Sequence, residues 1–404
     1  MVLMFAAAPD AKADGTGFEF KNNDVVAFMG EAATVEMRRH GYIEAALTSR
    51  FHDRALQFRI LGWQGDSVYQ QHRMPNFPDV AAQLKDRGVS VVLAWYGLIE
   101  SFDGTNRLNA FADQYNKFLD GIATHVQRDR LVLIGPTPVE SIGPHGPDPA
   151  VQNSNVRLYN ETIRVLAARH GAPFVDLFPV LPVASEVRLT DNGTMLNRYA
   201  YWLITPRVEQ ALGYPQRQWA VAINVDDRRI QAEGATVADL SVETARLRFT
   251  VHDQMLPLAS FTDAQGKVHV TDERVLRVAG LPAGRWALSI DGEAILEATD
   301  RQWTQGRAIT TGPDYDQAHT LRELIDLKNE FFMRHWRPLN WDFVHGERQN
   351  VPASRQHDDR NVRWFPGELQ EYVSIIAKQE KQIHETARPR QRTYQLTRIS
   401  EVTP

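Results

Sequence analysis

The 404-residue sequence contains no cysteine. Disulfide bonds, cysteine-ligated metals and thiol catalysis are therefore excluded. No apolar run reaches the roughly 18 residues that a membrane-spanning helix needs. The net charge of −5 argues against a general nucleic-acid binder, because such a protein needs a basic face. The length leaves room for two or three domains, each with its own core.

Two common cofactor motifs are also missing. The sequence has no Gly-x4-Gly-Lys-Ser/Thr loop for phosphates. The turn after the first predicted strand contains Gly30 but lacks the three spaced glycines of a dinucleotide site. No His-x3-His pair on a predicted helix indicates a metal site. We therefore expect no cofactor and no metal.

The first residues, "MVLMFAAAPDAKADG", carry a short apolar patch without a basic start. The patch is too short for a complete signal peptide, although it fits the trimmed end of one. We predict that residues 1–20 form a flexible N-terminus.

Residues 21–208 alternate between short apolar strands and amphipathic helices. Strands rich in Val, Ile and Leu are typical of a parallel sheet that helices cover on both faces. The pattern predicts a doubly wound domain of three layers, α/β/α. Binding sites in such sheets form beyond the carboxyl ends of the strands. Those ends are predicted at Gly30, 62–66, 97–102 and 135–138.

The rest of the chain changes character twice. Residues 209–310 are short alternating stretches separated by turn residues, which predicts an antiparallel β-rich domain. Residues 311–404 form a predicted helical C-terminal segment, with helices over 316–338 and 367–387. Pro338 ends the first of these helices. We expect the basic tail, residues 388–404, to be loose.

The strand ends carry four motifs in order: "FMGEAAT" (28–34), "LGWQGDSV" (61–68), "WYGLIES" (95–101) and "LTDNGTML" (189–196). Their order and spacing resemble the blocks of the SGNH, or GDSL-type, hydrolase family. The resemblance implies a flavodoxin-like α/β/α fold and esterase or acyl hydrolase activity. The later stretch "LKNEFFMRHWRPLNW" (327–341) resembles multi-domain members common in planctomycete-type bacteria.

The resemblance also assigns site positions, and most of them depart from the family. Ala32 stands where the family has its nucleophilic serine, and Ile99 where it has the asparagine of the oxyanion hole. Met195 replaces the catalytic histidine, and Asn192 the aspartate. Gly65 keeps the place of the oxyanion-hole glycine.

These departures remove the chemistry of the family. Alanine has no hydroxyl group, methionine does not exchange a proton near neutral pH, and isoleucine donates no side-chain hydrogen bond. Loss of a triad nucleophile or base costs on the order of 10⁶ in rate. The apolar replacements are expected to converge and fill the old pocket. We therefore predict a catalytically inactive relative that binds a protein partner or a carbohydrate, or serves as a subunit of an assembly.

Two alternatives stay open. One is an active ester or acyl hydrolase that acts on acetylated carbohydrates or lipid esters through non-standard residues. Polar candidates near the rim of the site are Glu31, Asp66, Ser67, Glu100 and Asp191. In a purely structural interpretation, Asp66 and Ser67 cap the next helix, and the two glutamates either lie at the rim or make structural hydrogen bonds. The other alternative is a Ser–His pair elsewhere in the chain.

Aromatic residues follow the same motifs and suit binding of sugars, binding of apolar peptide anchors, or core packing. They are Trp63, Trp95, Tyr96, Phe102, Tyr201 and Trp202. The aromatic residues of the C-terminal helices are expected to dock either on the main domain or on a partner protein. The resemblance also predicts export to the periplasm or outside the cell. Without export, the protein would be cytoplasmic.

Overall fold

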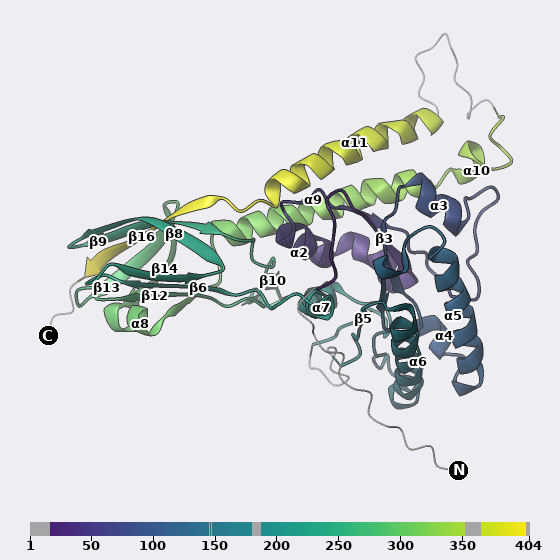
Figure 1. Cartoon of the computed structure of the whole chain (residues 1–404), viewed down its shortest axis with the longest axis horizontal. Helices are drawn as coiled ribbons and strands as arrows, with labels where there is room; N and C mark the ends of the chain where they lie inside the picture. Colours follow the sequence, from purple (N-terminus) through teal and green to yellow (C-terminus); the bar gives the residue numbers. More distant parts are fainter. Residues whose placement is uncertain (1–16, 145, 147, 180–186, 352–364, 401–404) are drawn as a thin grey trace, which may run out of the picture.

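The computed structural model describes residues 17–144, 146, 148–179, 187–351 and 365–400. Figure 1 shows an α/β domain at one end and a β domain at the other. The long helix α9 (Pro313–Trp336) runs from the β domain along the α/β domain. Among the described residues, none of the helices combines the length and apolarity required to span a membrane.

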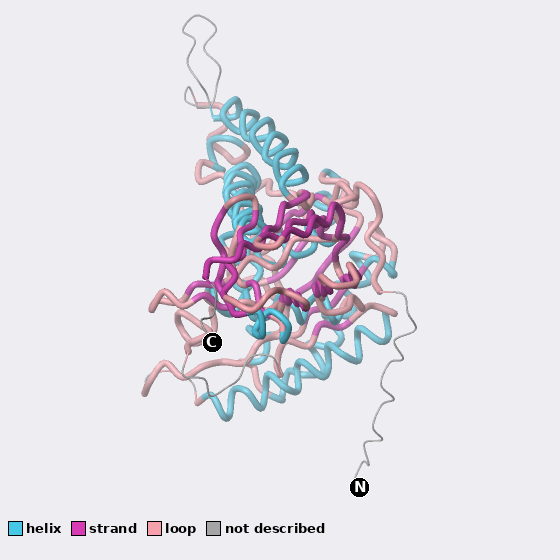
Figure 2. The backbone as a smooth tube through the Cα atoms, turned by 90° about the vertical axis from the view of Figure 1, so that its left-hand side faces the viewer, coloured by secondary structure: helices cyan, strands magenta, loops and turns pink. Residues whose placement is uncertain are grey.

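The α/β domain is built on a parallel sheet in the order β2-β1-β3-β4-β5. Its strands are β1 Val25–Gly30, β2 Gln57–Ile60, β3 Val91–Trp95, β4 Leu131–Ile134 and β5 Phe174–Val175. This is the flavodoxin-like order, so the predicted fold class is confirmed. Figure 2 looks from the side of the β domain, whose strands lie in front, with helices above and below them.

Both faces of this sheet are buried. Val26 and Phe28 of β1 pack into one hydrophobic cluster, and Ala27 and Met29 pack into another on the opposite face. Successive residues of a strand point to opposite faces, so a continuous apolar run requires cover on both. The helices of the domain are α1 Ala32–Glu36, α2 Tyr42–Arg50, α3 Val80–Asp86, α4 Leu98–Ser101, α5 Leu108–Ile122, α6 Pro149–His170 and α7 Arg198–Ala211. Short 3-10 turns are η1 Met37–Arg39, η2 Thr105–Arg107 and η3 Arg128–Arg130.

The β domain contains two larger sheets that enclose a shared core. One has the order β15-β12-β6-β7 and the other β14-β13-β16-β9-β8. The strands are β6 Trp219–Asn224, β7 Arg229–Glu233, β8 Ala235–Glu243, β9 Arg246–Asp253, β12 Arg274–Ala279, β13 Arg285–Ile290, β14 Glu293–Thr299, β15 Arg307–Ile309 and β16 Gln391–Ser400. The pairing is antiparallel, as predicted, except between β6 and β12. The hairpin of β10 Phe261–Thr262 and β11 Val268–His269 and the helix α8 Asp300–Gln305 complete this part.

The predicted loose tail is wrong, because β16 lies in the middle of a sheet between β13 and β9. Tyr394 and Leu396 are fully buried in the core of the β domain. The alternation of "TYQLT" is a strand pattern, and the basic residues of the tail obscured it. The predicted flexible N-terminus is also wrong at Phe18 and Phe20, which are buried against the α/β domain, while residues 1–16 lie outside the described part.

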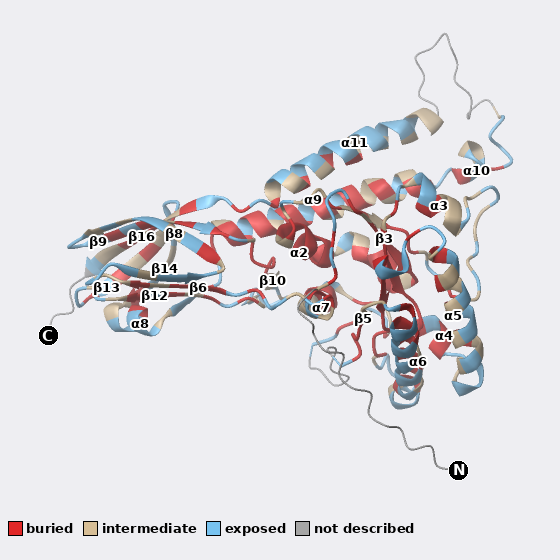
Figure 3. Ribbon diagram, in the orientation of Figure 1, coloured by how far each residue is buried: buried red, intermediate tan, exposed pale blue. Residues whose placement is uncertain are grey.

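The C-terminal helices dock on the main domain. Lys328 of α9 is buried and pairs with Glu44 of α2 at 2.7 Å. The second long helix, α11 (Phe365–Thr386), packs along α9, and its Glu380 pairs with Arg59 of β2. Figure 3 shows that the outer side of α11 is exposed. The short helix α10 (Trp341–Val344) follows α9 and precedes α11 in the chain.

Candidate functional site

The turn after β1 begins at Gly30, and only glycine fits there. A Cβ atom at this position would lie 2.2 Å from the backbone oxygen of Trp95 and 2.3 Å from the hydroxyl oxygen of Thr34. Helix α1 follows after one residue, Glu31. The chain therefore makes the tight strand–turn–helix connection that presents a nucleophile in the resembling family, with Ala32 in the first helical position.

Glu31 connects the turns that follow β1 and β3. Its side chain is only 2% exposed and accepts hydrogen bonds from the backbone N–H groups of Leu98 at 2.9 Å and Ile99 at 3.1 Å. Burial raises the pKa of Glu31 well above its ordinary value, and the nearby charge of Glu100 raises it further. The carboxylate is thus held inside the protein, and its predicted place at the rim is wrong.

Glu100 is a second buried acid beside Glu31. It is 1% exposed and accepts hydrogen bonds from the backbone N–H groups of Val68 at 2.7 Å and Gly97 at 2.9 Å. Burial raises the pKa of Glu100, and these hydrogen bonds oppose the shift. The rim position is wrong here too, whereas the structural hydrogen bonding expected of both glutamates is confirmed.

Asp66 and Ser67 do not cap a helix. The next helix, α3, begins at Val80, and Asp79 caps it by accepting a hydrogen bond from the Ala82 N–H at 2.8 Å. Asp66 is buried and binds Arg73 through both oxygens, at 2.6 and 2.7 Å. The buried Ser67 hydroxyl accepts a hydrogen bond from the Gln70 N–H at 3.2 Å. Both side chains therefore hold the loop after β2 in place.

The positions that replace the family's catalytic residues are only partly brought together. Glu31 ties the start of α1 to Ile99, so Ala32 and Ile99 share the ends of two neighbouring strands. Ile99 is 38% exposed, and hence the prediction that the apolar replacements fill a closed pocket is wrong at this position. Met195 is half-buried in the loop before α7. That helix is joined to α1 because the Tyr201 hydroxyl donates a hydrogen bond to the backbone oxygen of Ala33.

The remaining predicted positions lie at the surface. Asn192 is exposed, and its side-chain oxygen accepts a hydrogen bond from the Met195 N–H at 2.8 Å, which shapes the loop. Asp191 is exposed as well. Gly65 is exposed with φ +83°, in the left-handed region where glycine is preferred. Gly65 is therefore open to solvent in the loop after β2.

Most aromatic residues of the motifs pack in the core. Trp95, Tyr96, Tyr201 and Trp202 are buried, which confirms the packing interpretation for them. Phe102 is 48% exposed beside Ile99 in the chain. Of this set, Phe102 is the side chain that most clearly faces solvent.

Trp63 in the loop after β2 contacts two arginines. The guanidinium of Arg337 lies 3.6 Å from the centroid of the indole ring, and that of Arg73 lies 4.5 Å from it. The Arg337 guanidinium also donates to the side chain of Gln64 at 2.9 Å. The sequence did not indicate this contact, although Arg337 belongs to the quoted stretch 327–341.

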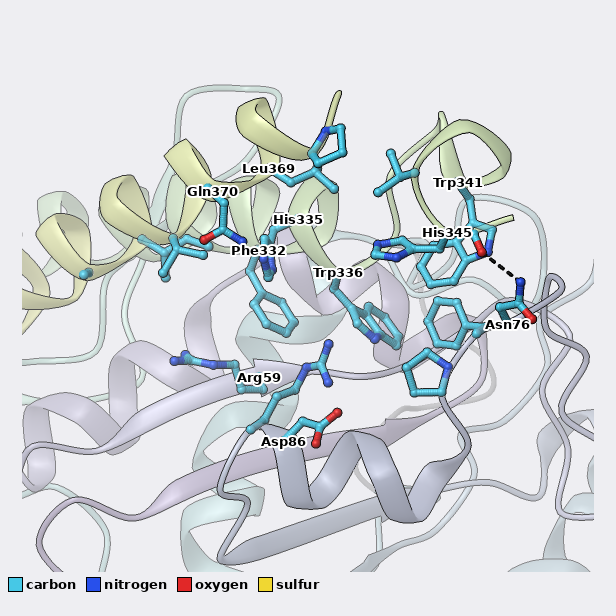
Figure 4. Close-up of a pocket in the computed structure, with 18 of the residues that line it drawn as sticks. Arg59, Asn76, Asp86, Phe332, His335, Trp336, Trp341, His345, Leu369 and Gln370 are labelled. Carbon is cyan, nitrogen blue, oxygen red and sulfur yellow. Dashed lines mark hydrogen bonds between the residues drawn. The ribbon is translucent and has the colours of Figure 1, made fainter. Parts of the chain in front are cut away.

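A cavity of about 600 Å³ lies between α3, α9, α10 and α11 (Figure 4). Aromatic rings form much of its wall, and among them the rings of Phe77 and Trp341 have centroids 4.6 Å apart. Trp336 lies 5.9 Å from Trp63 between ring centroids, so the wall continues to the loop after β2. The Asn76 side chain donates a hydrogen bond to the backbone oxygen of His345 at 2.9 Å, which closes one end.

The polar groups of this cavity come from several elements. Arg59 of β2 pairs with Glu380 of α11 at 2.5 Å. Burial lowers the pKa of His335 and of His345, and in His335 the nearby Arg87 and Arg59 lower the pKa further. These residues stand far apart in the sequence, and no local motif connects them.

One hydroxyl–histidine pair lies outside the strand ends. The Ser260 hydroxyl oxygen and the Nε2 atom of His319 on α9 are 2.8 Å apart. Ser260 is 5% exposed. The two residues are 59 positions apart, so sequence spacing did not reveal them. Over the ranges that the structure describes, no group of His, Asp and Glu side chains is arranged to hold a metal ion.

Comparisons with known proteins agree with this architecture. Residues 28–194 match the family model of the GDSL-like Lipase/Acylhydrolase family. BT4096, a gut microbial diltiazem-metabolizing enzyme, superimposes with a TM-score of 0.75 and 18% identity, over 96% of this chain and 100% of that one. The extra domains thus share its architecture too.

Two smaller hydrolases each cover about half of this chain. LAE5, an alpha/beta hydrolase enzyme from the metagenome of Lake Arreo, Spain, is 20% identical with a TM-score of 0.37, over 49% of this chain and 98% of that one. Axe2, an acetylxylan esterase from Geobacillus stearothermophilus, is 12% identical with a TM-score of 0.37, over 48% and 96%. The search of curated proteins found no match. Residues 28–194 thus match the GDSL-like lipase/acylhydrolase family, and the chain carries additional domain structure beyond that hydrolase core.

Proposed function

We propose that this chain acts by binding and not by ester hydrolysis. The observation that carries the proposal is Ala32, which occupies the first position of α1, where the resembling family presents its serine. A hydrolase of this class needs a hydroxyl nucleophile, a base and an oxyanion hole. Met195 and Ile99 stand at the positions of the base and of one oxyanion donor.

The polar residues around these positions are engaged in other contacts. Glu31 and Glu100 bind backbone N–H groups, and Asp66 is held by Arg73. The Ser67 hydroxyl is used within its own loop. Their bonding supports a fold that is kept for recognition of a protein, a carbohydrate or another ligand, or for assembly.

A second candidate function is ester hydrolysis at Ser260 and His319. Their 2.8 Å contact is the hydrogen-bonded geometry of a nucleophile and its base. Burial lowers the pKa of His319, so the imidazole is neutral near pH 7, as a base must be. Against this function stands the low exposure of Ser260, since a substrate must reach the hydroxyl.

Hydrolysis of 4-nitrophenyl acetate separates the two functions. We expect the natural protein, Ser260→Ala and the control Ser67→Ala to give the same background rate. The triple variant Ala32→Ser, Ile99→Asn, Met195→His tests the register of the motifs, and turnover gained by it supports the assigned positions. Turnover by the natural protein that is lost in Ser260→Ala alone would establish the second candidate and refute the first.

A further inference from the structure

The cavity beside α9 has the size and lining of a small-molecule site. Its volume of about 600 Å³ falls within the roughly 300–1,000 Å³ that is common for such sites. Phe332 and Trp336 are buried and stack with ring planes 15° apart and centroids at 6.2 Å. In Figure 4 the helices that carry His335 and Leu369 lie on one side of both rings. The side chains of Arg59 and Asp86 lie on the other side. A flat apolar group in the cavity would contact the parts of these rings that reach it, together with the rings of Phe77 and Trp341.

Arg87 gives this cavity a cation that forms no ion pair within the described part of the chain. Its guanidinium makes one hydrogen bond, to the backbone oxygen of Gln83 at 3.4 Å, and forms no ion pair with any residue that the structure describes. Arg59, the other arginine of the wall, is neutralised by Glu380. Arg87 is half-buried, so water solvates it only in part. A half-buried guanidinium without a counter-ion favours an incoming anion.

The other ionisable groups of the wall decide which ligand charge Arg87 can pair with. Asp86 is exposed and forms no ion pair with Arg87 among the described residues, but its charge acts on Arg87 and raises the pKa of that guanidinium, so Asp86 competes with an incoming anion. His335 and His345 are neutral near pH 7 because their pKa values are lowered. A single guanidinium matches the charge of a carboxylate better than that of a phosphate.

Arg87 and the aromatic wall meet at Gln83. The Gln83 side-chain oxygen accepts a hydrogen bond from the Trp336 indole N–H at 3.2 Å, while its backbone oxygen binds Arg87. One residue thus places the cation next to the aromatic surface. A ligand with a ring and a carboxylate joined directly satisfies both features at once.

We propose that this cavity binds a small aromatic carboxylate, whose ring packs against Phe332 and Trp336 and whose carboxylate pairs with Arg87. The inference deepens the proposed binding role and rests on it. The guanidinium forms two parallel hydrogen bonds to the carboxylate. The aromatic wall supplies apolar contact for the ring.

Calorimetric titration of the full chain with 2-naphthoate and with its neutral analogue 2-naphthamide tests the proposal. We expect the acid to bind roughly 10-fold or more tightly than the amide, because a hydrogen bond to a charged group is involved. Arg87→Gln should reduce the affinity for the acid to that for the amide and leave the amide unchanged. Lys85→Gln, on the exposed part of the same helix and away from the cavity, is the matched control and should change neither affinity.

Two further variants keep the test decisive if Arg87→Gln fails to fold. Asp86→Asn removes the competing negative charge and should strengthen binding of the acid. Val373→Trp places a large ring in the cavity from an exposed position of α11 and should abolish binding of both compounds. Equal affinity for acid and amide, binding unaffected by Val373→Trp, or no binding at all would overturn the proposal. Each of these results would leave the hydrolysis assay, and with it the proposed function, unaffected.

Discussion

The buried carboxylate of Glu31 accepts a hydrogen bond from the backbone N–H of Leu98 at 2.9 Å. One acid thereby joins the turn after β1 to the turn after β3, the two turns that carry Ala32 and Ile99. In this arrangement the acid supports the backbone of both turns.

Glu31→Ala is expected to destabilise the protein by about 2–4 kcal/mol, because two buried N–H groups lose their acceptor and a cavity remains. Urea unfolding measures the change. Asp191→Ala, at an exposed position near the same site, is the control and should lie within about 0.5 kcal/mol of the natural protein. Equal effects of the two substitutions would contradict a supporting role for Glu31.

His40 should make the protein sensitive to acid. Burial and the neighbouring Arg198 and Arg322 lower the pKa of His40 to about 4, below its ordinary value of 6.5. The unfolded chain therefore binds a proton at higher pH than the folded one, and stability falls as the pH drops from 6.5 towards 4.

His40→Phe keeps a ring against Tyr201, whose centroid lies 5.1 Å from that of His40, and removes the titrating group. Relative to the natural protein, the variant should gain stability between pH 7 and pH 4.5. Unfolding free energies at both pH values provide the check. A difference that stays constant with pH would show that His40 does not titrate in this range.

Asp326 should act in the opposite direction. Burial raises its pKa from 3.8 to about 6, although Arg322 and the Gly41 N–H favour the ionised form. The folded state thus holds the proton more tightly, and the contribution of Asp326 to stability is lost as the pH rises from 3.8 through 6.

Asp326→Asn should flatten this decline by no more than about 3 kcal/mol between pH 4 and pH 7. The variant also loses the ion pair with Arg322, which changes the free energy of unfolding at every pH. The remaining dependence on pH then comes from the other titrating groups. Urea unfolding across this pH range measures the slope. If stability fell with rising pH as steeply in the variant as in the natural protein, a group other than Asp326 would cause the decline.

Arg73 should be needed because Asp66 is buried. Arg73→Met leaves an unpaired buried acid and is expected to cost about 3–5 kcal/mol. Burial already raises the pKa of Asp66, so part of this cost disappears at low pH. The double variant Arg73→Met, Asp66→Asn should recover most of the loss, and a double-mutant cycle by thermal or urea unfolding measures it. Additive losses would mean that the two side chains do not depend on each other.

Local patterns predicted the α/β domain well. Continuous apolar strands such as 25–30 occur where both faces of a sheet are covered, and this property can be read from neighbouring residues. The strand ends, and with them Gly30, Gly65 and the replaced position Ala32, followed from the same order. The predictions failed where a local feature had two meanings: the basic charges of 388–404 suggested a loose tail, yet the alternation around Tyr394 built a central strand.

The sequence by itself therefore determined the α/β core and the presence of Ala32 in the turn after its first strand, because strands, turns and the identity of one residue are local properties. Only the tertiary structure decided that Glu31 is buried and that Ser260 meets His319. It also decided that Arg87 lies near Trp336 without an ion pair to any described residue. These relationships join residues tens to hundreds of positions apart. Burial and contact depend on which helices cover which faces of the sheets. Helices α9 and α11 reach their places on the α/β domain only when the whole chain is folded.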